Sequence, residues 1–221
     1  MVKGTRTVTD LAKFIARAAT HPQPASTCAI DSWTRSAASY LDRLLVHPGL
    51  GKHAPELIEV VTDVKRDVYL LDTLPLVLNH VDLAPTNIFT NDDGTFTNVI
   101  DWDGARIEAF GMSLWSLYEY FIDARTSNSV YEQVLEDGRT VRETLEQAFW
   151  RQLWESTSGA LSLTDAPAIR ASAMVGAVFR YLDEDNLDEI EESGGDSLAR
   201  AKMFIPSIHA MKIVESQVEG H

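Results

Sequence analysis

Sequence features that mark secreted, membrane-spanning or metal-stabilised proteins are scarce in this chain. Its single cysteine, Cys28, cannot form an internal disulfide, and no group of Cys and His has the spacing of zinc ligands. No apolar run approaches the roughly 20 residues that span a bilayer, and the first residues lack the apolar segment of a signal peptide. We therefore expect a cytoplasmic chain without a structural metal.

Basic residues are also scarce. The chain has 19 Lys and Arg against 33 Asp and Glu, which gives a net charge of −14. Such a charge repels nucleic-acid phosphates and anionic lipid, so we expect neither nucleic acid nor a membrane as a partner. Acidic residues crowd the segment 183–196, which contains no basic one. Two interpretations of this segment stay open, a solvated loop or helix end and a patch that recruits a cationic substrate or partner.

What the chain does have is the composition of an ordinary globular protein. Of its 221 residues, 45 % are hydrophobic and 24 % are charged, and the sequence contains no internal repeat and no linker. The patterns predict one domain over residues 1–221, with a helical part at 9–73, a strand, loop and hairpin at 74–104, and a second helical part at 105–221. The expected fold class is therefore α+β and mainly α-helical.

Apolar residues at helical spacing predict the individual helices. Thr9 or Asp10 is placed to cap the first helix, and Pro206 is expected to kink or split the last one, at about 197–214. We expect Trp102 to pack in the core, with stacking on a substrate as the alternative. The predicted core helices carry the aromatic residues Trp33, Tyr40, Trp150, Trp154 and Phe179.

The period of the pattern changes in the middle of the chain. The short apolar run at 74–78 is typical of a buried strand, and it ends at Asn79 and His80. Two further strand patterns, at 88–90 and 96–100, flank a turn that ends with a glycine. We predict a β-hairpin whose ends lie beside His80.

This region also holds the densest group of polar residues. Residues 80–87 read His-Val-Asp-Leu-Ala-Pro-Thr-Asn, and residues 100–103, after the hairpin, read Ile-Asp-Trp-Asp. The hairpin is expected to bring Asp101 back to Asp82 and Asn87. Carboxylate and amide oxygens suit a hard cation such as Mg²⁺, which also keeps waters and substrate phosphates as ligands. Alternatively, Asp82 could accept a proton from a hydroxyl group.

These motifs resemble the aminoglycoside phosphotransferase and choline kinase-like superfamily, relatives of the protein kinases. In that superfamily the catalytic loop reads H-x-D-x-x-x-x-N and the metal-binding segment reads I-D-W-E/D. Both occur here in order, and the stretch 76–117, with Phe-Gly-Met-Ser-Leu-Trp at 110–115, looks like the fungal branch. The resemblance implies the C-terminal, larger lobe of the protein-kinase-like fold, with a small β-hairpin at the catalytic loop.

The resemblance also implies a role for each matching residue. Asp82 would orient or deprotonate the hydroxyl of a small-molecule acceptor, while Asn87 and Asp101 would hold Mg²⁺ against the phosphates of ATP or GTP. Asp103 matches the acidic position after the tryptophan and would support the metal. His80 would brace the loop. No residue is assigned to the nucleotide base.

The features of the family's N-terminal β-lobe are missing from the pattern. That lobe carries a glycine-rich loop and a lysine paired with a glutamate, yet only three glycines precede His80. The segment 49–52, Gly-Leu-Gly-Lys, lacks the full P-loop spacing and is interpreted as a turn that ends a helix. We therefore expect a C-terminal lobe alone. A separate N-terminal lobe or a partner chain is then an expected partner, because it would supply the missing part.

Three hypotheses follow. The first is a phosphotransferase that transfers a phosphoryl group from a nucleotide to the hydroxyl group of a small molecule. A cationic small molecule is one option for this substrate. The second is an enzyme that lacks the nucleotide lobe and uses Asp82, His80 or Asp101 as acid and base, as an isomerase, cyclase or lyase would. The third is a catalytically inactive binding protein.

Overall fold

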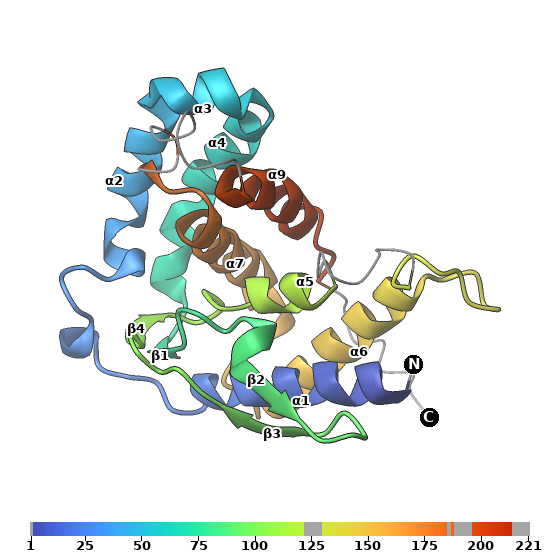
Figure 1. The fold of residues 1–221 in the computed structure, drawn as a ribbon. Helices are drawn as coiled ribbons and strands as arrows, with labels where there is room; N and C mark the ends of the chain where they lie inside the picture. Colours follow the sequence, from blue (N-terminus) through green and yellow to red (C-terminus); the bar gives the residue numbers. More distant parts are fainter. Residues whose placement is uncertain (1, 122–129, 185–186, 188–195, 214–221) are drawn as a thin grey trace.

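A computed structural model describes residues 2–121, 130–184, 187 and 196–213 (Figure 1). The described residues form an α+β fold that is mainly helical, as the sequence predicted. None of the helices in these ranges is long and apolar enough to cross a membrane. Most of the acidic segment 183–196 lies outside the described residues, although Glu184 is described and pairs with Arg43 at 2.8 Å.

The first helix is longer than the sequence predicted. Helix α1 runs over Val2–Ala19, so Thr9 and Asp10 lie inside it and do not cap it. Its first turns are held by the hairpin, because the Thr7 hydroxyl donates to the carbonyl oxygen of Gly94 at 2.8 Å. Asp10 instead accepts from the backbone N–H of Phe96 at 3.2 Å. These tertiary contacts extend the helix beyond the point where its sequence pattern starts.

The next helices follow the predicted order. Helix α2 (Trp33–Val46) is capped by Ser32, whose side chain accepts from a first-turn backbone N–H, and α4 (Ile58–Asp67) follows the proline at 55. The segment 49–52 is not a turn, because it lies within a short helix, α3 (Pro48–His53). Short 3₁₀ turns lie at Ala25–Thr27, Pro55–Leu57 and Val68–Thr73.

The predicted hairpin is present. Strands β2 (Ile88–Thr90) and β3 (Phe96–Val99) pair antiparallel, with Ile88 opposite Val99. The turn between them needs Gly94, which has φ +86° and whose added Cβ would lie 2.5 Å from the carbonyl oxygen of Lys3. The predicted strand before the loop is also present, as β1 (Leu76–Asn79).

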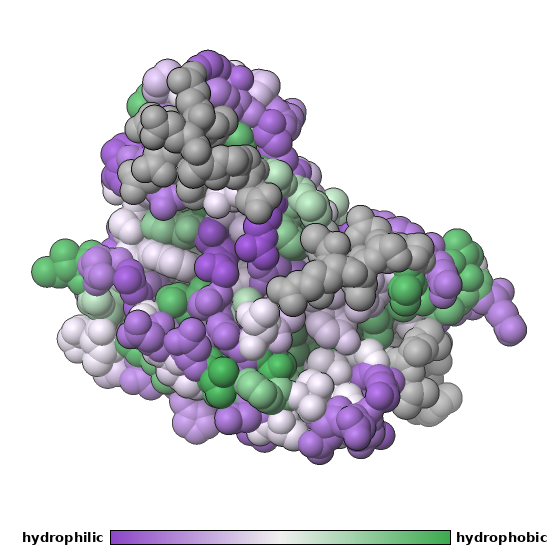
Figure 2. Space-filling model, in the orientation of Figure 1, coloured by the Kyte–Doolittle hydropathy of each residue, from purple (hydrophilic) through white to green (hydrophobic). Residues whose placement is uncertain are grey.

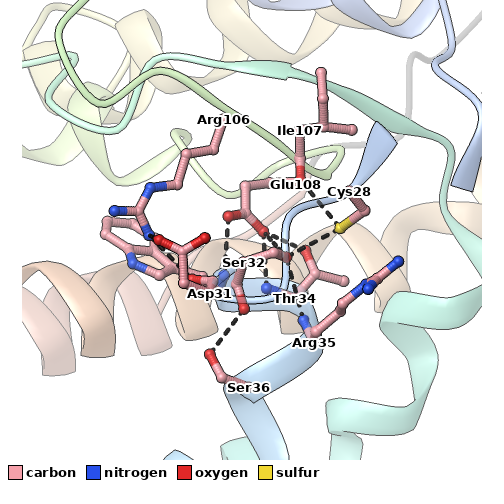
Figure 3. Close-up of polar contacts among 10 residues, drawn as sticks. Cys28, Asp31, Ser32, Thr34, Arg35, Ser36, Arg106, Ile107 and Glu108 are labelled. Carbon is pink, nitrogen blue, oxygen red and sulfur yellow. Dashed lines mark hydrogen bonds and ion pairs between the residues drawn. The ribbon is translucent and has the colours of Figure 1, made fainter. Parts of the chain in front are cut away.

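A fourth strand was missed by the sequence prediction. Residues expected to return to helix after Gly104 first form β4 (Arg106–Ala109), which pairs antiparallel with β1. Its Glu108 is fully buried and accepts hydrogen bonds from the first turn of α2 (Figure 3). The donors are the Ser32 and Thr34 hydroxyls and the backbone N–H groups of Trp33 and Thr34, at 2.7–2.9 Å. The buried Glu108 carboxylate at the N-terminus of α2 thus attaches the sheet of β1 and β4 to this helix.

In the described part of the chain, four α-helices follow β4. They are α5 (Trp115–Phe121), α6 (Val141–Ser156), α7 (Ala166–Tyr181) and α9 (Asp196–His209), with a 3₁₀ turn at Leu163–Asp165. Helix α6 starts with a capping box between Thr140 and Glu143. Helix α9 continues through Pro206 and is not split there.

The core joins the two ends of the chain. Figure 1 shows α1 lying along α6 and α7 passing between α2 and α9. Phe179 on α7 stacks on Trp33 and Tyr40 of α2, with ring centroids 5.2 and 4.3 Å apart, as the sequence prediction of the core required. Helix α7 also approaches the segment before α5 closely, because an added Cβ on Gly176 would lie 1.9 Å from the carbonyl oxygen of Met112.

Candidate functional site

Two loops meet where β1 ends and the hairpin closes. His80, which is only 4 % exposed, follows β1, and its Nε2 lies 2.9 Å from the carbonyl oxygen of Ile100. A carbonyl can only accept a hydrogen bond, so Nε2 carries the proton. The backbone N–H of Ile100 in turn donates to the carbonyl oxygen of Asn87 at 3.0 Å. These two bonds fix Asp101 next to the first loop.

Asp82 and Asn87 are in direct contact. A 3₁₀ turn over Pro85–Asn87 places the Asn87 amide so that Nδ2 donates to the Asp82 backbone oxygen at 2.8 Å and to its Oδ2 at 3.2 Å. The other carboxylate oxygen, Oδ1, lies 2.6 Å from Nη2 of Arg180. Both oxygens of the expected base therefore have partners within the protein.

Asp101 and Asp103 are exposed at the end of the hairpin. Asp101 has φ 61°, in the left-handed region that few residues other than glycine adopt. Such backbone conformations persist where surrounding bonds determine them, and here His80 holds the preceding carbonyl. Within the described residues, Asp103 makes no hydrogen bond or ion pair with His80, Asp82 or Asn87. The structure therefore joins Asp82 to Asn87 and joins His80 and Asn87 to the backbone of Ile100, next to Asp101, while the exposed side chains of Asp101 and Asp103 make no hydrogen bond or ion pair with them within the described residues.

Trp102 is not a buried core residue, contrary to the sequence prediction. It is 43 % exposed, and its ring stands edge-on to His80 with centroids 4.8 Å apart. Its indole N–H donates to the carbonyl oxygen of Val99 at 3.1 Å. The Trp102 ring also packs against the ring of Phe14 on α1, with ring centroids 6.1 Å apart. Trp102 therefore connects α1 to both loops of the site.

Sequence reasoning missed the charged residues that surround Asp82. Arg180, at the end of α7, also lies over the Trp115 ring at 5.2 Å. Beyond it, the buried Glu119 pairs with Arg200 at 3.3 Å, and burial raises the pKa of the Glu119 carboxyl. The signal in the sequence was Arg180 at the end of a mostly apolar helix whose other charged residue is Arg170.

The donor set fits magnesium better than a softer metal. Among the described residues, no three His, Cys, Asp or Glu side chains are close enough to form a metal site. Mg²⁺ does not need such a cage, because it is bound through one or two carboxylates together with waters and phosphates. The Asn87 amide and the Asp101 carboxylate, on neighbouring backbone, match that requirement.

Figure 2 shows a recess between the end of the molecule that carries α2 to α4 and the part that carries the hairpin of β2 and β3, and strongly hydrophilic residues stand in it.

Comparison with known proteins identifies the family. The model of the phosphotransferase enzyme family matches residues 4–155, about two thirds of the chain. This range starts in α1, includes both loops of the site and ends in α6. No curated protein matches the sequence of this chain closely enough to count as a relative. The chain belongs to the phosphotransferase enzyme family.

Proposed function

We propose that the chain acts as a phosphotransferase on the hydroxyl group of a small molecule, with ATP or GTP as the phosphoryl donor. Asp82 would take the proton of the hydroxyl, whose oxygen bonds the terminal phosphorus as the bond to the nucleoside diphosphate breaks. The observation that carries this proposal is the pair of bonds that hold Asn87 against Asp82 and Ile100 against Asn87. They support the proposal because they hold Asn87 against Asp82 and the residue before Asp101 against Asn87.

Asn87 and Asp101 are the residues proposed to hold Mg²⁺, with Asp103 in support. When bound, the ion would neutralise charge on the nucleotide phosphates. The contribution of the protein is to keep both ligands in place. The His80 ring does so for Asp101 by holding the carbonyl of the residue before it.

Arg180 is proposed to serve the same reaction from the other side of Asp82. The ion pair at 2.6 Å keeps a positive charge next to the carboxylate that receives the proton. In a chain of net charge −14, this charge would also favour the approach of a phosphoryl group. Replacing Arg180 with methionine should therefore lower the rate of transfer by about 10²-fold while leaving the fold intact.

We further propose that the chain corresponds to the C-terminal lobe of the kinase-like fold, in a form similar to its fungal branch. The described strands form two separate pairs, β1 with β4 and β2 with β3, and the described residues before β1 contain no strand. The groups that grip the nucleotide, a glycine-rich loop and a lysine, would then come from another segment or a partner chain.

Binding of nucleotide and magnesium tests the proposal directly. Mg-ATP or Mg-GTP should raise the melting temperature of the chain, and Asp101→Ala should abolish the shift. Asp82→Asn should keep the shift and lose phosphoryl transfer. Asp92→Ala, an exposed carboxylate in the hairpin turn, is the matched control and should behave like the wild type. No shift at millimolar nucleotide, or equal shifts in the Asp101 and Asp92 variants, would contradict the proposal.

A second candidate is an acid/base enzyme that uses no nucleotide. The observation that favours it is that the described residues before β1 contain no strand that could carry the nucleotide-binding loop of the family. Such an enzyme would convert a small metabolite without Mg-ATP and would lose activity on Asp82→Asn. Activity that is independent of nucleotide and unchanged in Asp101→Ala would decide for this candidate.

A further inference from the structure

Helix α5 carries a buried carboxylate close to the loop that contains Asp82. Glu119 is 4 % exposed, and α5 contacts the 3₁₀ turn of that loop as well as α7 and α9, beside which it lies in Figure 1. Oε1 of Glu119 lies 3.3 Å from Nη2 of Arg200 on α9, whose side chain is exposed. Burying a carboxylate is unfavourable unless it is paired, and one exposed partner compensates for this cost only in part. A second positive charge is therefore expected near Glu119.

Arg180 supplies this charge. Trp115 and Glu119 lie one turn apart on the same face of α5. The guanidinium of Arg180 lies over the Trp115 ring, 5.2 Å from its centroid, and thus on the face of α5 that carries Glu119. Burial raises the pKa of the Glu119 carboxyl, and the positive charge of Arg180 counteracts this rise more strongly than that of Arg200 does. Arg180 therefore interacts with Glu119 as well as with Asp82.

The four charged side chains form a row in which the sign alternates. This charge row consists of Asp82, Arg180, Glu119 and Arg200, and it leads from the loop of the site to α9. Arg180 stands between two carboxylates, and its planar guanidinium has several N–H groups that can face both of them. Without Glu119, the ion pair with Asp82 and the Trp115 ring alone would hold the Arg180 side chain.

We propose that Glu119 is a positioning residue that holds the Arg180 guanidinium in place against Asp82. This inference rests on the proposed function, in which the charge of Arg180 serves phosphoryl transfer. Glu119 is buried in the protein, so it acts on the reaction through Arg180 and does not itself touch the substrate. Loss of its charge should therefore lower kcat and leave KM nearly unchanged.

The hold on Arg180 can be measured without substrate or nucleotide. Its Nε atom is buried and makes no hydrogen bond within the described residues, so the rate at which Nε–H exchanges with water reports how firmly the side chain is held. NMR of the arginine Nε–H groups at neutral pH gives this rate, and Arg180→Met identifies the signal. In Glu119→Gln the exchange should be at least about tenfold faster than in the wild type. An unchanged rate would overturn the proposal.

Glu146→Gln is the matched control. Glu146 is half-buried on α6 and burial raises the pKa of its carboxyl too, but its partners Tyr118 and Arg142 do not belong to the charge row. The control should keep the exchange rate of the wild type. Equal acceleration in Glu146→Gln and Glu119→Gln would overturn the proposal, because it would reflect general loosening. If Glu119→Gln does not fold, Glu119→Asp, which withdraws the carboxylate by one methylene, decides by the same measurement.

A kinetic cycle tests the role of Glu119 in the reaction. Glu119→Gln should lower kcat at least about tenfold and change KM less than about twofold. In the background of Arg180→Met, the same substitution should change kcat less than about twofold. An equal loss in both backgrounds, or wild-type kcat in Glu119→Gln, would overturn the proposal. A wild type that transfers no phosphoryl group would instead contradict the proposed function, and the exchange rate would still decide whether Glu119 positions Arg180.

Discussion

The buried carboxylate of Glu108 allows the sharpest prediction about stability. Its two oxygens accept four hydrogen bonds from Ser32, Trp33 and Thr34, and the side chain has no exposure to solvent. Truncation to alanine leaves these donors without an acceptor and removes the negative charge from the N-terminus of α2. Each buried donor left unpaired costs about 1–3 kcal/mol, and water can reach some of them. We expect Glu108→Ala to lower the free energy of unfolding by about 3–5 kcal/mol.

Urea unfolding followed by far-UV circular dichroism measures this loss. Glu108→Gln, which keeps the shape but turns an NH₂ group toward the same donors, should lose about 1–3 kcal/mol. The matched control is Asp31→Asn, because the Asp31 carboxylate is exposed and lies 3.4 Å from Arg106, and its loss should stay within about 0.5 kcal/mol. A loss below about 1 kcal/mol for Glu108→Ala, with an unchanged slope against urea, would refute the reasoning.

Two further predictions concern a buried acid and a close helix contact. Burial raises the pKa of Glu119, so the folded state keeps the proton of this carboxyl to higher pH than the unfolded chain does. The free energy of unfolding of the wild type, relative to that of Glu119→Gln, should therefore rise as the pH is lowered from 7 to 5. If urea unfolding shows the same difference between the two proteins at pH 7 and pH 5, the prediction is wrong. Gly176→Ala should lower the free energy of unfolding by more than about 3 kcal/mol, because its methyl group would lie 1.9 Å from the Met112 carbonyl oxygen. Gly51 in α3 has open space around it, so Gly51→Ala should leave the free energy of unfolding unchanged or raise it by up to about 1 kcal/mol in urea unfolding.

The centre of the site was the part most open to prediction from sequence. A short apolar strand, a turn with glycine and a second strand form a local pattern, so the hairpin that returns Asp101 to Asn87 could be derived from spacing alone. The helices that stack Phe179 on Trp33 were predictable for a similar reason, since each shows one apolar face at helical spacing.

Contacts between distant segments were not predictable. Arg180 reaches Asp82 from a helix almost a hundred residues later, and a single sequence contains no sign of that pairing. Strand β4 was missed because its Glu108 is a charged residue in a buried position, which only the start of α2 satisfies. The exposure of Trp102 was missed because an aromatic residue after an acid is equally consistent with core and surface.

The packing of α1 along α6 has a consequence for biosynthesis. The apolar face of α1, with Val8, Leu11 and Ile15 buried in the finished protein, is covered by a helix that begins only at Val141. At about 5–20 residues per second, a ribosome needs roughly 10 s to make the intervening chain. During that time the face of α1 that packs against α6 lacks this partner. We expect nascent chains of this protein to depend on ribosome-associated chaperones, and fragments that end before α6 to aggregate.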